Sequence, residues 1–185
     1  KRINEFLGQE PDIQDGVSAN KKLSNVDISF DKVNFMYDDT GIQALKNVSF
    51  TLESGKTLAV MGPTGSGKTT LLQLLSKTYL PHSGKVSLGN FSLEEYAQKD
   101  IREIMGVVPQ QPFLFSDTIA HNIRFGKPDA TEQEIEKAAK QAAVHDNIVD
   151  FTAGYETMLG ERGITLSGGQ KQRVSIARAL IKNPK

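Results

Sequence analysis

The chain has 185 residues, of which 38% are hydrophobic and 24% charged, as in an ordinary globular domain. Lys and Arg number 22, and so do Asp and Glu, so no net charge favours nucleic acid as a partner. The absence of cysteine excludes disulfides and cysteine-ligated zinc. No apolar run approaches the roughly 20 residues that span a bilayer. Because the first residue is Lys rather than Met, we expect a soluble piece of a larger polypeptide.

The first half of the chain has the pattern of a polar linker followed by strands. Residues 1–24 are polar, with scattered Gly and Pro, and predict a linker. Short runs rich in β-branched and aromatic residues predict strands at 26–37, 48–52, 56–61, 85–88 and 104–108. The run at 56–61 leads into a glycine-rich turn. A helix is expected from Gly67 to about Leu80, ended by Pro81.

The second half has helical patterns. Residues 118–125 look helical, and a capping box that begins at Thr131 opens a helix over 135–144. A second capping box begins at Ser167 and opens a helix that runs through Ile181. The three histidines show no ligand spacing and are expected to be packed or solvated, namely His82, His121 and His145.

A phosphate-binding pattern, G-x-x-x-x-G-K-[ST], lies between the strand predicted at 56–61 and the following helix. It consists of Gly62, Pro63, Thr64, Gly65, Ser66, Gly67, Lys68 and Thr69, and Thr70 follows it. The glycines let backbone N–H groups curl around a phosphate, and the helix N-terminus adds a positive dipole end. Lys68 can reach the β- and γ-phosphates, and the Thr69 hydroxyl can ligate Mg²⁺. We therefore expect a nucleoside triphosphate to bind here.

A second motif narrows the class of nucleotide-binding protein. Leu166 is followed by Ser167, Gly168, Gly169 and Gln170, the signature sequence of ABC ATPases, and the chain resembles that family from about residue 26 to its last residue. The resemblance implies an α/β fold, a P-loop NTPase core with an antiparallel β subdomain and an α-helical subdomain. It also implies that Ser167–Gln170 contact the γ-phosphate held by a partner domain, so that ATP is bound between two subunits.

The resemblance assigns roles to further residues. Tyr37 occupies the place of the aromatic residue that stacks on adenine. Gln110 occupies that of the Q-loop glutamine, which approaches Mg²⁺ and the attacking water, and Gln111 is an alternative from the sequence alone. Glu161-Arg162-Gly163 resembles the X-loop of exporters, which touches the membrane domain. The run at 117–126 also looks exporter-like, as does the end of the linker at Gln14-Asp15-Gly16.

The chain departs from the family pattern at its end. Family members follow the signature helix with a strand that ends in an Asp for Mg²⁺ and a Glu that polarises water, and then a D-loop and a switch histidine. Here the sequence ends at Asn183-Pro184-Lys185. We therefore expect a domain incomplete at its C-terminus, inactive or nearly so by itself, with an exposed sheet edge.

These features predict the ATP-binding domain of an ABC exporter, with a linker at 1–24, the domain at 25–185 and its helical subdomain at about 112–170. The implied cofactors are ATP and Mg²⁺. The implied partners are a second ATP-binding domain, identical or different, and the transmembrane domains, at the cytoplasmic face of a membrane. Two alternatives stay open, a non-catalytic nucleotide-binding module and an ABC-type ATPase of DNA maintenance. In ATPases of DNA maintenance, long coiled coils separate the phosphate-binding pattern from the signature. In this chain about a hundred residues without heptads lie between these two motifs.

Overall fold

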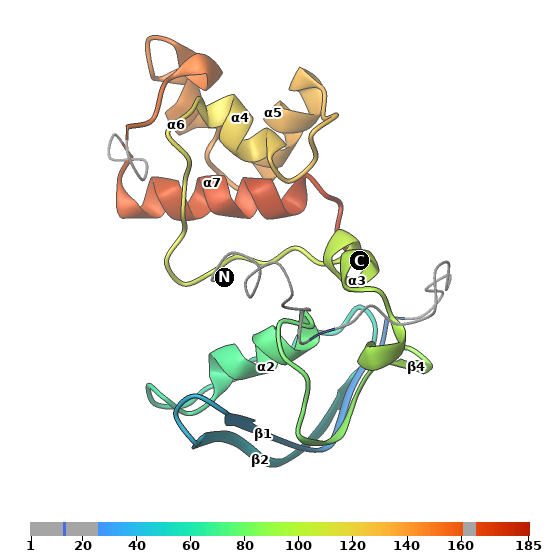
Figure 1. Cartoon of the computed structure of the whole chain (residues 1–185). Coiled ribbons are helices and arrows are strands. Elements are labelled where there is room, and N and C mark those ends of the chain that lie inside the picture. The colour runs from blue at the N-terminus through green and yellow to red at the C-terminus, as the bar shows by residue number, and fades with distance from the viewer. Residues whose placement is uncertain (1–12, 14–25, 161–165) are drawn as a thin grey trace, which may run out of the picture. The chain divides into compact units, whose positions relative to one another are not determined.

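The computed structural model describes residues 13, 26–160 and 166–185, and the chain divides into two compact units, Lys1–Ile101 and Arg102–Lys185 (Figure 1). The predicted linker and the predicted X-loop lie outside the described residues, apart from Ile13. Among the helices in the described part of the chain, none is both long and apolar enough to cross a membrane.

The first unit is built on a four-stranded antiparallel sheet in the order β2-β1-β3-β4. Its strands are β1 (Ile28–Tyr37), β2 (Ile42–Leu52), β3 (Ser83–Leu88) and β4 (Phe91–Ser92). On β1, Phe30 pairs with Phe50 of β2 on one side and with Val86 of β3 on the other, and the two phenylalanine rings stack at 4.6 Å. β1 is therefore the central strand that ties the sheet together.

A bulge in β1 explains which residues it buries. Phe30, Val33 and Phe35 are all at most 4% exposed, although strict alternation would place Phe30 and Val33 on opposite faces. The pairing register shifts between Phe30 and Val33, where Lys32 has a φ of 49°. The extra residue returns Val33 to the core face.

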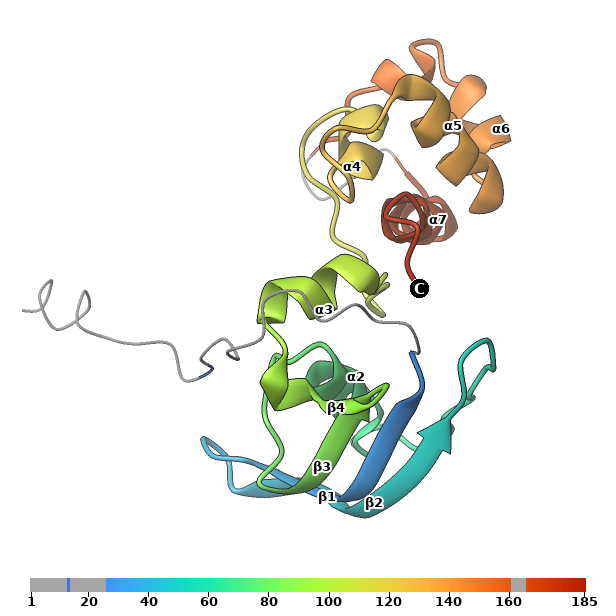
Figure 2. The same cartoon turned by 90° about the vertical axis from the view of Figure 1, so that its right-hand side faces the viewer.

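Helix α2 (Lys68–Leu75) covers one face of this sheet and buries Leu74 to 1% exposure (Figure 2). The helix is shorter than predicted, because Lys77 has a φ of 52° and turns the chain away. The Lys77 side chain is itself buried, and its ammonium donates to the carbonyl oxygen of Tyr96 at 2.6 Å. Two further elements follow β4, η1 (Leu93–Glu95) and α3 (Gln98–Ile104).

The second unit is helical. Its elements are α4 (Ile119–Arg124), α5 (Glu132–Gln141), α6 (His145–Val149), η2 (Gly154–Glu156) and α7 (Gly168–Leu180). Both predicted capping boxes are confirmed, with Thr131 at the start of α5 and Ser167 at the start of α7. Val174 and Ala177 of α7, and Ile181 just after it, are buried against α4 and α5, in a core that includes Ile119 and Ile135.

Two predicted strands are wrong. Residues 56–61 and 104–108 are not strands, and in the first of them Met61 is 92% exposed and Val60 46% exposed. A strand needs a neighbour to satisfy its backbone N–H and C=O groups. No strand among the described residues pairs with either segment, so their apolar sequence alone does not make them strands.

Candidate functional site

The predicted phosphate loop turns directly into α2. Gly65 and Gly67 have φ values of 81° and 85°, a backbone conformation that glycine adopts without strain. Packing adds a second constraint at Gly67. A Cβ atom there would lie 2.5 Å from the carbonyl oxygen of Ala44 and 2.9 Å from a methyl group of Leu45, both on β2. The sheet therefore fixes the loop at the point where the helix begins.

The Lys68 ammonium lies inside the curl of the loop. Its Nζ donates to the carbonyl oxygens of Gly62 and Pro63, at 2.8 and 2.6 Å, and to the Ser66 hydroxyl at 3.2 Å. The three N–H groups of the ammonium thus each have an acceptor within the loop. Residues 62–66 of the loop are exposed to solvent. The loop presents a cation, free backbone amides and a helix N-terminus on one accessible surface, which is the chemistry that recognises phosphate.

Tyr37, at the end of β1, lies against the first turns of α2. Its hydroxyl is 2.9 Å from the hydroxyl of Thr70 and donates to Oε1 of Gln73 at 2.8 Å. Thr70 is 3% exposed and follows directly on Lys68 and Thr69, whose hydroxyl is exposed. The structure therefore brings the aromatic residue beside the helix that begins at the phosphate loop, and the stacking of Tyr37 on adenine stays a prediction.

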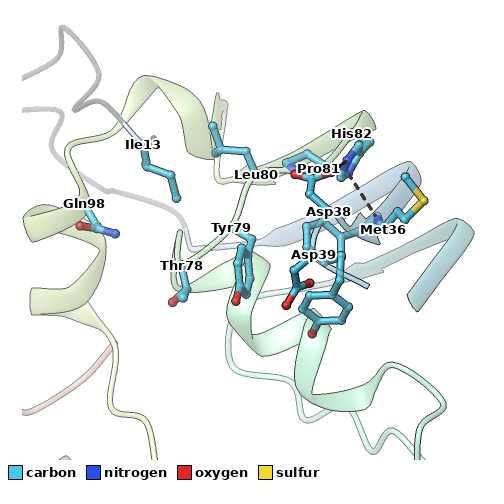
Figure 3. Close-up of a pocket in the computed structure, with 12 residues that line it drawn as sticks. Ile13, Met36, Asp38, Asp39, Thr78, Tyr79, Leu80, Pro81, His82 and Gln98 are labelled. Carbon is cyan, nitrogen blue, oxygen red and sulfur yellow. Dashed lines mark hydrogen bonds and ion pairs between the residues drawn. The ribbon is translucent and has the colours of Figure 1, made fainter. Parts of the chain in front are cut away.

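A hollow of about 640 Å³ opens beside Tyr37 (Figure 3). It is lined by aromatic, acidic and apolar side chains, and in Figure 3 Gln98 lies on one side, Asp38 on the other and Tyr79 between them. His82 links two residues that line the hollow. Its Nδ1 accepts from the Met36 N–H at 3.3 Å, and its Nε2 lies 3.1 Å from the Asp38 carboxylate. The neutral His82 with a proton on Nε2 satisfies both contacts.

Three residues of this region were missed by sequence reasoning, namely Gln73, Tyr79 and His82. Helix spacing places Gln73 on the same face as Thr70, but nothing in the local sequence places that face beside Tyr37 of β1. Tyr79 and His82 follow a turn after the helix ends, and no local pattern of the sequence places them beside β1.

The signature residues form the exposed start of α7. The Ser167 side chain accepts from the Gln170 N–H at 3.3 Å, and the Gln170 side chain accepts from the Ser167 N–H at 2.9 Å. Ser167, Gly168 and Gly169 are all exposed. Among the described residues, an added Cβ atom would meet none within 4 Å at Gly168, and Arg173 alone, at 3.6 Å, at Gly169. The helix start is thus capped and open to solvent.

Two arginines fix α7 behind this start. Arg173 donates to the carbonyl oxygen of Ala143 at 3.0 Å, between α5 and α6. Arg178 donates to the backbone oxygens of Asn122 and Phe113, both at 2.8 Å, and burial lowers its pKa. Asn122 is fully buried, and its side chain bonds Arg178 and both backbone groups of Phe115. The signature is therefore held on a rigid element.

Gln110, predicted to serve Mg²⁺ and the attacking water, lies in the second unit, between α3 and α4. Gln110 and Gln111 are both exposed, so exposure does not separate the two alternatives. The phosphate loop belongs to the first unit, and the assignment of Gln110 stays a prediction.

A lysine-containing phosphate loop beside an aromatic residue, together with a helix capped by Ser-Gly-Gly-Gln, defines a nucleotide-binding domain of the ABC type. Residues 45–185 match the ABC transporter family, and the chain belongs to that family.

Similar proteins agree with this assignment. The chain is 44% identical over its whole length to the uncharacterized ABC transporter ATP-binding protein YknU of Bacillus subtilis, of which it covers 32%. It is 44% identical over 97% of its length to the human ATP-binding cassette sub-family B member 6, of which it covers 21%. The chain thus spans about a third or less of the length of these relatives.

A solved structure confirms the predicted fold class. The structure of a bacterial Atm1-family ABC exporter with ATP bound matches 99% of this chain with a TM-score of 0.93 and 38% sequence identity, and the chain covers 32% of that protein. The antiparallel sheet, the phosphate loop followed by a helix, and the helical second unit therefore belong to one known α/β architecture.

Proposed function

We propose that the chain binds ATP, with the triphosphate over the loop at Gly62–Thr70 and the adenine against the ring of Tyr37. One observation carries this proposal. The hydroxyl of Tyr37 lies 2.9 Å from that of Thr70, so the aromatic residue lies against the helix that the phosphate loop opens.

Mg²⁺ would accompany the nucleotide. The Thr69 hydroxyl has no hydrogen-bond partner among the described residues, and hydroxyl and amide oxygens are ligands of the kind that Mg²⁺ accepts. We propose Thr69 and the side-chain oxygen of Gln110 as the protein's contributions. The ion would neutralise charge on the phosphate oxygens, while Lys68 holds the β- and γ-phosphates in place.

A second ATP-binding domain would complete the site. Ser167–Gln170 form a capped helix start, where the cap uses the N–H groups of Ser167 and Gln170 and leaves those of Gly168 and Gly169 to attract an anion. We propose that these residues contact the γ-phosphate of an ATP bound to a partner domain. Nothing in the described part of the chain crowds Gly168 or Gly169, which leaves room for such an approach.

In the full-length protein, we propose that closing and reopening of the paired domains drives export through attached transmembrane domains, with this domain at the cytoplasmic face. The similarity to an Atm1-family exporter supports this role. The relatives are about three or more times as long as the chain, which leaves room in them for membrane-spanning parts.

We also propose that the 185-residue polypeptide turns ATP over slowly when it is assayed alone. No Asp or Glu follows the signature in the printed sequence, so no carboxylate in that region can activate water. Loss of general-base catalysis lowers rates by roughly 10²–10⁴-fold. A turnover assay beside a longer chain that includes the following segment would test this, and equal rates would contradict it.

Binding itself is tested by titrating the chain with a ribose-labelled fluorescent ATP analogue and Mg²⁺, beside Lys68→Ala. Removing the ammonium should weaken binding by roughly 10–100-fold, the effect of a charged hydrogen bond to phosphate. Lys56→Ala removes an exposed lysine upstream of the loop and should change nothing. Absence of binding by the unaltered chain, or equal binding by Lys68→Ala, would contradict the proposal.

A further inference from the structure

Gln73 lies on α2, on the helix face that carries Thr70, and reaches across to β1. Its Oε1 accepts the hydroxyl proton of Tyr37 at 2.8 Å. Since a phenol has one proton, the Tyr37 oxygen then accepts from the hydroxyl of Thr70, 2.9 Å away. Tyr37 is thereby held at its far end by two side chains of the helix that begins at the phosphate loop.

The backbone of Gln73 holds the neighbouring ring. Its carbonyl oxygen accepts from the N–H groups of Thr78 at 2.8 Å and Tyr79 at 3.4 Å. The ring of Tyr79 stands at 90° to that of Tyr37, with centroids 5.6 Å apart, and Phe35 stands at 88° to Tyr37 at 5.0 Å. One residue thus anchors two of the three rings at the edge of the hollow, and Figure 3 shows Tyr79 among the residues that line it.

Tyr37 needs such an anchor because of its position in the chain. It is the last residue of β1, and the turn that follows, Asp38–Gly41, is exposed throughout. A side chain that must be immobilised when a ligand binds lowers affinity, and fixing it beforehand removes that loss. The hydrogen bond to Gln73 therefore preorganises the ring.

We propose that Gln73 is a positioning residue for nucleobase recognition, which fixes Tyr37 so that its ring is ready to stack on the base of a nucleoside triphosphate. This rests on the proposed function of Tyr37. Gln73 acts through Tyr37 and not on the phosphates, so its loss weakens binding of ligands that have a base and spares those that lack one.

The experiment compares Mg²⁺-ATP with inorganic tripolyphosphate as competitors of a fluorescent ATP analogue on the full chain. Gln73→Met keeps the length of the side chain without its acceptor, and should weaken ATP roughly three- to tenfold while tripolyphosphate affinity stays unchanged. Tyr37→Phe should give the same pattern, and the double variant should be no worse than either single one. Gln73→Glu restores an acceptor and should recover the ratio of the two affinities.

The controls separate the possible failures. Leu72→Met alters an exposed neighbour on the same helix and should leave both affinities unchanged. If Gln73→Met weakens both ligands equally, or adds to Tyr37→Phe, the residue is merely structural and the inference is overturned. If ATP binds, depends on Lys68 and ignores every Gln73 variant, the inference alone fails. If Tyr37→Ala leaves ATP affinity unchanged, stacking on Tyr37 is wrong, and the inference falls with it.

Discussion

The two glycine-rich loops of this chain, at 62–70 and 166–170, look alike in sequence but differ in what requires their glycines. At Gly67 the requirement is internal, because φ is 85° and a Cβ atom would lie 2.5 Å from the backbone of β2. At Gly168 the backbone φ is not positive, and a Cβ atom would meet none of the described residues within 4 Å. The described fold requires the glycine of the first loop, whereas it does not require Gly168 in the second.

This difference separates two ways of building an anion site. The phosphate loop is set by packing against a sheet in the same unit, so it can form before any ligand arrives. The signature is set by its cap, which uses the Ser167 and Gln170 side chains, and by the arginines that hold α7, while Ser167, Gly168 and Gly169 are exposed. Under the proposed function, the glycines that the described fold does not need leave room for a partner that approaches closely.

The largest effect is expected at Gly67. Gly67→Ala places a side chain in a left-handed conformation and against Ala44, and should destabilise the protein by roughly 2–5 kcal/mol. Gly65→Ala is the matched control, since φ is 81° but the space is open, and should cost about 1–2 kcal/mol. Urea denaturation followed by circular dichroism measures both. Equal losses would mean that packing against β2 does not shape the loop.

A second prediction uses Gln170, whose side chain caps α7. Gln170→Glu keeps the acceptor that bonds the Ser167 N–H, and glutamate is favoured at this position, so stability should be unchanged or slightly higher. The new negative charge would repel the γ-phosphate of the proposed partner site. ATP-dependent association, measured by analytical ultracentrifugation, should weaken roughly tenfold or more. Unchanged association would show that the helix start meets no anion.

The sequence predicted the structural features that depend on local chemistry. The capping boxes at Thr131 and Ser167 follow from residue type and spacing, and both are confirmed. The strands at 56–61 and 104–108 were wrong because a strand depends on a neighbour, which local sequence cannot supply. For the same reason Gln73 was missed, since its role arises only when α2 packs against Tyr37 of β1.

The smallest effect, and the one that best sharpens the comparison, is expected at Gly168. Gly168→Ala adds a methyl group in open space at the first residue of α7, where alanine is intrinsically better than glycine. Stability in urea should therefore rise by about 0.5–1 kcal/mol. If the glycine is kept for an approaching phosphate, ATP-dependent association should fall in the same variant, because the methyl group occupies that space. Unfolding and ultracentrifugation on one preparation measure both quantities. Lower stability would mean that Gly168, like Gly67, is required by the protein's own fold, and the distinction between the two loops would be lost.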